Sequence, residues 1–324
     1  MIPATLRMLA GVALAYGVAL VLYWQVRRRG GWAWAALACG LAAILACPLV
    51  IPPEHVPLRA VAVFVSVDLF FRLVDFTRQV QSGRRTSVNW PTYARFLIPW
   101  PVLLIVFNQR SRQLPPDAPR APELLRAAVA GGVFAVALSL TLAAQYSPRL
   151  RESFPLDHAT KVLLFLVGIE ALAQLLLGLE RLGGFDSLPF IDRAYQSRTP
   201  AEFWFRYNQR VRLWLTLNVF LPAGGRRAPL RAIFAAFLVS ALLHELAFGI
   251  ATSRFDGYQA LFFLLQAPAV MLSPALERFA SRGPLQSALA RGATIAWFSL
   301  TSILFFTSAD RVLPFFYVSR PWLP

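Results

Sequence analysis

Residues 197–250 decide the fold and hold the residues of greatest chemical interest. They begin with SRTPAEFWFRYNQRVRLWLTLNVFLP (197–222), pass through the basic turn GGRRAPLR (224–231), and end with AIFAAFLVSALLHELAFGI (232–250). The last segment is apolar over almost its whole length, close to the roughly 20 residues that a membrane-spanning helix needs. His244 lies inside it. An ionisable side chain at membrane depth is costly, so His244 is a candidate functional residue.

The composition is that of an integral membrane protein. Of 324 residues, 57% are hydrophobic and 15% are charged, and the mean hydropathy is +0.54, whereas soluble domains carry about 25% charged residues. The sequence has no repeat and no hydrophilic stretch long enough for a second domain. We therefore predict an all-α fold, a polytopic helical membrane protein, with residues 1–324 as a single domain.

Eight apolar runs are long enough to cross about 30 Å of hydrocarbon. They are residues 8–24, 32–51, 60–76, 127–146, 159–179, 232–251, 258–275 and 292–308. A ninth candidate, Phe96–Phe107, is short and contains Pro99 and Pro101, which favours a re-entrant or interfacial segment. The sequence thus predicts eight or nine membrane helices.

The net charge of +16 is spread over short loops between the apolar runs. This pattern argues against a nucleic-acid partner and indicates contacts with lipid headgroups. By the positive-inside rule, the loops 27–31, 77–126, 180–231 and 276–291 face the cytoplasm. The basic residues are arginines apart from Lys161, a bias typical of GC-rich genomes, so we expect a multi-pass protein of a bacterial inner membrane.

Two short patterns, FWFRYN (203–208) and SALLHE (240–245), lie on either side of Pro222. This arrangement resembles the membrane-bound O-acyltransferase superfamily, and most closely its wax synthase-like branch. The resemblance implies that Asn208 and His244 form a catalytic pair in a helical membrane bundle. It also implies acyl-coenzyme A as co-substrate, no resident cofactor, and a lipophilic alcohol as acceptor.

The chemistry of the two residues suits acyl transfer from a thioester to an alcohol. The hydroxyl proton must be removed and the developing oxyanion must be stabilised. Burial in an apolar bundle disfavours the charged imidazole, so His244 is expected to be a neutral base. The amide of Asn208 can donate hydrogen bonds without carrying a charge. The alternatives are that His244 packs between helices and that Asn208 caps a helix.

Further side chains around this pair are predicted to contact substrate. Arginines interleave with aromatic rings here, so they are expected to grip either the phosphates of acyl-coenzyme A or anionic lipids; Arg212 belongs to the same pattern. His244-Glu245 begins an HExxH zinc motif, but position 248 is Phe, so no metal site is expected. Glu245 is instead expected to orient nearby backbone or polar groups. The predicted substrate-binding set is Phe203, Trp204, Arg206, Tyr207, Arg210, Ser240 and Glu245.

Other polar residues also fall within apolar runs. Asp68, Arg72 and Asp75 share one helical face, which favours a structural ion-pair cluster over a substrate passage. Glu170 and Gln174 form a similar polar face.

The remaining histidines and the cysteines are given no chemistry. His55 and His158 are expected to be surface residues in outer loops. Cys39 and Cys47 are placed on the same helix, too far apart to form a disulfide.

The leading hypothesis is an O-acyltransferase that acts on a long-chain alcohol, with membrane lipids as its surroundings. A sterol or natural-product acceptor is an alternative within the same family. The rival from another class is a lipid or small-molecule transporter. The enzyme hypothesis requires Asn208 and His244 to face a common cavity that is open to both the cytoplasm and the bilayer, whereas a transporter does not.

Overall fold

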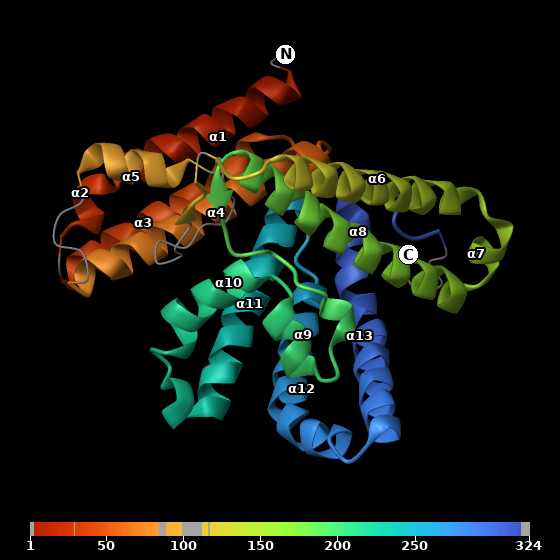
Figure 1. The fold of residues 1–324 in the computed structure, drawn as a ribbon. Coiled ribbons are helices and arrows are strands. Elements are labelled where there is room, and N and C mark those ends of the chain that lie inside the picture. The colour runs from red at the N-terminus through yellow and green to blue at the C-terminus, as the bar shows by residue number, and fades with distance from the viewer. Residues whose placement is uncertain (1–2, 29, 84–88, 99–111, 116, 319–324) are drawn as a thin grey trace.

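The structure is a computed structural model that describes residues 3–28, 30–83, 89–98, 112–115 and 117–318. It is built from helices (Figure 1), so the predicted all-α fold class is confirmed. The helices are α1 (Ala4–Val21), α2 (Tyr23–Val26), α3 (Gly31–Ala46), α4 (Val56–Gln81), α5 (Trp90–Leu97), α6 (Ala121–Ala143), α7 (Pro148–Glu152), α8 (Phe154–Leu182), α9 (Pro200–Arg206), α10 (Gln209–Leu215), α11 (Pro229–Thr252), α12 (Tyr258–Ala280) and α13 (Pro284–Val312).

Short irregular elements connect these helices. Single 3-10 turns span Cys47–Val50, Ala144–Tyr146, Ala194–Gln196 and Gly225–Arg227, and a π-turn spans Thr216–Phe220. The strands β1 (Arg112–Gln113) and β2 (Phe185–Asp186) form one antiparallel pair. Prolines in the first turn mark where several long helices begin, because that position needs no backbone N–H donor. These prolines are Pro57, Pro122, Pro155, Pro229 and Pro284.

Seven helical stretches of the described chain are long and apolar enough to cross a membrane. They are Ala4–Val26, Gly31–Val50, Ala121–Tyr146, Phe154–Leu182, Pro229–Thr252, Tyr258–Ala280 and Pro284–Val312. Each overlaps one of the eight predicted runs. The eighth run, residues 60–76, lies in α4, a continuous helix of 26 residues whose charges keep it out of this group.

Helix α4 lies inside the bundle and carries its charges inward. It packs against α1, α3 and α11, and Asp68, Arg72 and Asp75 are all buried. Arg72 Nε donates to Asp68 Oδ2 at 2.6 Å, and its Nη1 donates to the carbonyl of Phe96 at 2.6 Å. The amide of Asn218 donates to Asp75 Oδ1 at 3.3 Å. These contacts agree with the predicted structural ion-pair cluster.

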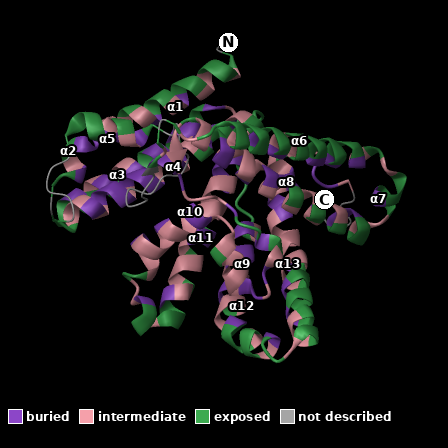
Figure 2. Ribbon diagram, viewed as in Figure 1, coloured by how far each residue is buried: buried purple, intermediate pink, exposed green. Residues whose placement is uncertain are grey.

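In Figure 1, α1–α5 lie at the upper left, α6–α8 at the upper right and α9–α13 below them. Helix α6 lies alongside α8, and α11 packs on α12 and α12 on α13. Buried residues gather along α3 and α4 (Figure 2), whereas the outer face of α6 exposes leucines and valines. Exposed apolar faces of this kind suit contact with lipid.

The candidate segment Phe96–Phe107 lies largely outside the described residues. Its first two residues end helix α5, whose N-terminus is capped by the Asn89 side chain accepting from Thr92 N at 3.0 Å.

The prediction that His158 is a surface residue is wrong. Helix α8 begins at Phe154, before the predicted run, so His158 lies within the helix and is 7% exposed. Its Nε2 contacts the carbonyl of Ser299 at 2.6 Å, and its Nδ1 contacts Tyr317 Oη at 2.6 Å. The polypeptide after α13 folds back over α8 here, since Asp157 Oδ2 accepts from Val318 N at 2.8 Å. A histidine with both ring nitrogens engaged in this way has a structural role.

The predictions for the other histidine and the cysteines agree with the structure. His55 is exposed just before α4, and Cys39 and Cys47 are free thiols.

Candidate active site

Asn208 lies between α9 and α10 in the left-handed conformation, with φ 47° and ψ 57°. Asparagine tolerates this region better than other side chains with a Cβ. Its Oδ1 accepts from Val211 N at 3.4 Å and so caps α10. With Oδ1 facing the helix, the amide NH2 group is the part of the side chain left to donate.

The loop around Asn208 is attached to α8. Arg193 N donates to Glu170 Oε1 at 3.1 Å, and Gln174 Nε2 donates to the carbonyl of Ile191 at 3.4 Å. The loop then reaches Asn208 itself, because Gln209 N donates to the carbonyl of Phe190 at 2.8 Å. The polar face predicted on this helix therefore positions the segment that carries Asn208.

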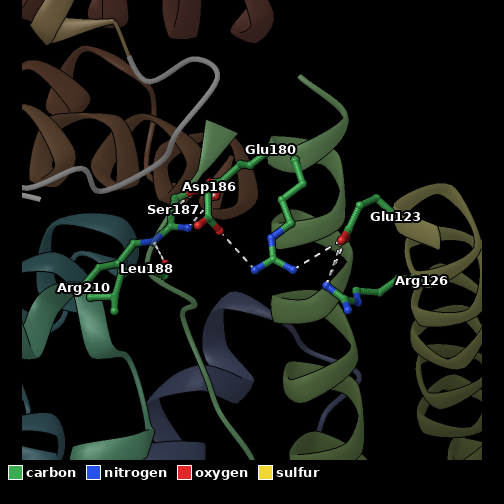
Figure 3. Close-up of polar contacts among 8 residues, drawn as sticks. Glu123, Arg126, Glu180, Asp186, Ser187, Leu188 and Arg210 are labelled. Atoms are coloured by element: carbon green, nitrogen blue, oxygen red, sulfur yellow. Dashed lines mark hydrogen bonds and ion pairs between the residues drawn. The ribbon is translucent and has the colours of Figure 1, made fainter. Parts of the chain in front are cut away.

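Arg210 makes a second, stronger connection to α8 (Figure 3). Its Nη1 and Nη2 donate to the two carboxylate oxygens of Glu180 at 2.8 and 2.6 Å. Its Nε donates to the carbonyl of Leu188 at 2.7 Å, and its guanidinium lies 3.9 Å from the ring centroid of Phe190. Arg210 is fully buried. The guanidinium is thus occupied by protein groups, and the structure gives Arg210 a structural role in place of the predicted phosphate contact.

One contact of His244 involves a ring nitrogen, and a second supports the ring. Its Nδ1 lies 2.8 Å from the main-chain carbonyl of Ser240, one turn earlier in α11. A carbonyl oxygen only accepts, so Nδ1 carries the proton and Nε2 keeps its lone pair. The ring packs on Phe263, with centroids 3.9 Å apart. The ring of His244 is therefore held in one orientation, with Nδ1 bound to the main chain. Ser240, a member of the predicted substrate-binding set, contacts His244 through its main-chain carbonyl.

Asn208, Ser240 and His244 line one cavity of about 350 Å³. The rest of its wall is apolar and comes from α4, α10, α11 and the end of α13: Ala60, Val63, Phe64, Val67, Phe71, Val211, Leu215, Leu243, Ala247, Phe248, Ala251, Ala309, Val312 and Leu313. The structure thus places both members of the predicted pair on the wall of one cavity, which is the first part of what the enzyme hypothesis requires.

Phe203, Trp204 and Tyr207 of the FWFRYN pattern pack outside the cavity and do not line it, and Phe205 is exposed. Phe203 stacks on Tyr207 at 5.1 Å between centroids. Trp204 packs on Phe263, the ring that supports His244, at 5.8 Å. Burial raises the pKa of Tyr207 to about 12, so its hydroxyl stays protonated at neutral pH.

Arg206 lines a second, polar cavity of about 600 Å³. Its wall is formed by Tyr195, Gln196, Arg198, Glu202, Arg206, Ser287 and Arg291. Arg206 Nη2 lies 3.0 Å from Glu202 Oε1. Burial raises the pKa of Glu202, but hydrogen bonds and charges from Arg198 and Arg206 outweigh it and lower the pKa overall. This cavity is suited to polar, anionic groups.

Glu245 points away from the cavity and caps α12. Its Oε1 accepts from Gly257 N at 2.8 Å and its Oε2 accepts from Ala260 N at 3.2 Å. Glu245 was predicted to orient nearby backbone or polar groups, and in the structure it binds the backbone at the start of α12.

Three residues that shape the site were not predicted from the sequence. Phe71 closes the cavity from α4, Phe263 supports the imidazole, and Glu180 holds Arg210. Of these three, only Glu180 is recognisable in the sequence, as a carboxylate at the end of an apolar run. Its partner, Arg210, lies 30 residues further along the chain.

Comparison with known proteins agrees with this geometry. Residues 153–309, which include Asn208 and His244, match the family model MBOAT, the membrane-bound O-acyltransferase family. The chain is 29% identical over 99 residues to diacylglycerol O-acyltransferase 1 of Arabidopsis thaliana, covering 30% of this chain and 19% of that protein. It is 28% identical over 94 residues to diacylglycerol O-acyltransferase 1C of Glycine max, covering 29% and 18%. The matched stretch is thus about a fifth of either relative's length. Residues 153–309, with both members of the predicted pair, carry the sequence pattern of the membrane-bound O-acyltransferase family.

Proposed function

We propose that this protein is a membrane O-acyltransferase that moves an acyl group from acyl-coenzyme A to the hydroxyl of a lipophilic acceptor. The observation that carries the proposal is the shared cavity. Asn208 and His244 line it together, and the Nδ1 contact with Ser240 leaves Nε2 of His244 as a free base.

The proposed reaction uses these two side chains and forms no covalent enzyme intermediate. The acceptor O–H gives its proton to Nε2 of His244 while its oxygen attacks the thioester carbonyl carbon. The amide of Asn208 donates to the carbonyl oxygen as it gains negative charge. The C–S bond then breaks, and the departing thiolate takes the proton back from the imidazolium. The products are an ester and free coenzyme A.

The proposed substrates follow from the chemistry of the two cavities. The apolar cavity beside His244 suits an aliphatic chain. The arginine-lined cavity containing Arg206 suits the phosphates of acyl-coenzyme A, which serves as co-substrate without a resident cofactor. We propose a multi-pass location in a bacterial inner membrane, with the arginine-rich loops on the cytoplasmic side.

A long-chain alcohol is the proposed acceptor, with a wax ester as the product. Diacylglycerol is the second candidate, because the proteins that resemble this chain are named diacylglycerol O-acyltransferases. Sterols and natural-product hydroxyls complete the panel of acceptors to be tested.

The test is acyl transfer by membranes that contain the wild type, His244→Ala or His55→Ala at equal levels. Labelled acyl-coenzyme A is offered with fatty alcohols, diacylglycerol and sterols, and the lipid products are resolved. His55 is the matched control, because it is exposed outside the cavity. We expect an ester from the wild type and His55→Ala and none from His244→Ala. Equal ester formation by His244→Ala would refute the assignment of the base, and no ester from the wild type would refute the proposed function.

A further inference from the structure

The cavity beside His244 is lined by successive turns of α4 and α11, which run in opposite directions. At one end, Phe71 of α4 packs with Leu243 of α11 and with α10. At the other end, Val63 packs with Ile250 and Ala251. The cavity wall therefore follows the two helices, with Asn208 and Ser240 at the Phe71 end and Ala251 at the other.

The polar atoms gather at one end of this cavity. Asn208, Ser240 and His244 are the polar residues of its described wall, and the wall beyond His244 is apolar. His244 and Ala251 are seven positions apart, a distance of about 10 Å along the helix. A bound substrate would thus have its reacting oxygen or carbonyl beside His244 and its hydrocarbon pointing toward Ala251.

Small side chains keep this end of the cavity open. Ala247 and Ala251 lie on the cavity face of α11, and Ala60 and Val63 lie on that of α4. A volume of about 350 Å³ equals roughly twelve water molecules in the liquid. Because a methylene is about as large as a water molecule, the cavity has room for one medium-length alkyl chain.

We propose that the cavity between α4 and α11 binds one unbranched alkyl chain, and that Val63, Ala247 and Ala251 set the greatest length accepted. The inference rests on the proposed function and specifies which substrates that function accepts. The chain belongs either to the acyl donor or to the alcohol acceptor, and both sources have the same chemistry.

The test is the length profile of ester formation in variants that fill the cavity at two depths. Ala251→Phe and Val63→Phe fill the same level from opposite walls, so both should exclude long chains and spare short ones. Ala247→Phe lies about 6 Å nearer to His244 along α11 and should exclude progressively shorter chains. We expect at least roughly tenfold lower kcat/KM for the longest chains and little change for the shortest, as pockets discriminate sterically.

Controls separate length selection from damage to the fold. Val61→Phe is the matched control for Val63→Phe, because Val61 lies on the same helix but is 52% exposed on its outer side, whereas Val63 is 4% exposed. It should keep the wild-type profile. Ala251→Leu, a smaller change, stands in where the phenylalanine variant fails to accumulate in the membrane.

Two substrate series identify the source of the chain. One varies acyl length with a fixed alcohol, and the other varies alcohol length with a fixed acyl group. A shift in one series supports the proposal and assigns the cavity to that substrate. Unchanged profiles in both series, with wild-type ester formation intact, overturn the proposal and leave the proposed function standing. No ester from the wild type at any length overturns both.

Discussion

Replacing Asn208 with glycine or alanine separates its chemical role from its structural one. The residue has a left-handed backbone conformation and caps α10 through Oδ1. Glycine adopts this conformation freely, whereas alanine does not. Both substitutions remove the amide donor.

The expected magnitudes differ between activity and stability. Loss of one donor to a developing oxyanion lowers kcat by about 10²–10³, or roughly 2.7–4 kcal/mol, and this loss should be the same in both variants. Glycine at a helix N-cap costs only a few tenths of a kcal/mol. Alanine should cost about 1 kcal/mol for the cap and roughly 1–2 kcal/mol for the left-handed backbone.

The assay pairs ester formation with thermal unfolding of the purified protein in detergent. We expect Asn208→Gly and Asn208→Ala to lose activity equally, while only Asn208→Ala unfolds at a clearly lower temperature. If Asn208→Gly keeps activity within about threefold of the wild type, well short of the loss expected for a missing donor, the asparagine serves only the backbone and the cap. The catalytic role would then be refuted.

Two further predictions concern carboxylates that stabilise the fold through an ion pair or a helix cap. Glu180→Gln should destabilise the protein by about 3–5 kcal/mol, because Arg210 would remain buried without its counter-charge. Glu123→Gln, which weakens a more exposed pair in the same region (Figure 3), should cost less than about 1 kcal/mol in the same unfolding measurement. Glu245→Ala should cost about 0.5–2 kcal/mol through loss of the α12 cap, with kcat per folded molecule unchanged. A selective fall in kcat for Glu245→Ala, with stability intact, would place Glu245 in the chemistry instead.

The membrane helices and the catalytic candidates could be predicted from sequence because their signals are local. A run of apolar residues marks a span wherever it packs, and His244 stands out within such a run. The short FWFRYN and SALLHE patterns identified Asn208 and His244 without any knowledge of their distance in space. The structure adds the fact that the two side chains line one cavity.

Residues whose environment depends on distant partners could not be predicted. His158 resembles a loop residue because the apolar run begins after it, yet Tyr317, 159 residues away, covers it. In the sequence, Arg210 resembles a phosphate-binding arginine. In the structure, its guanidinium is paired with the carboxylate of Glu180. In both cases the burial of a polar group is decided by a contact between segments far apart in the chain.

The bond between His244 and the carbonyl of Ser240 means that the proposed base needs no second side chain to fix its tautomer. In many hydrolases a separate carboxylate fixes the histidine tautomer, and mutation of that carboxylate disables the base. Here the fixing group is a main-chain oxygen of the same helix, which no side-chain substitution can delete. The side chain at position 240 is therefore free to vary without altering which nitrogen is basic. Variation there can reshape the substrate cavity while the acid–base chemistry stays intact, so the two properties can evolve, or be engineered, independently.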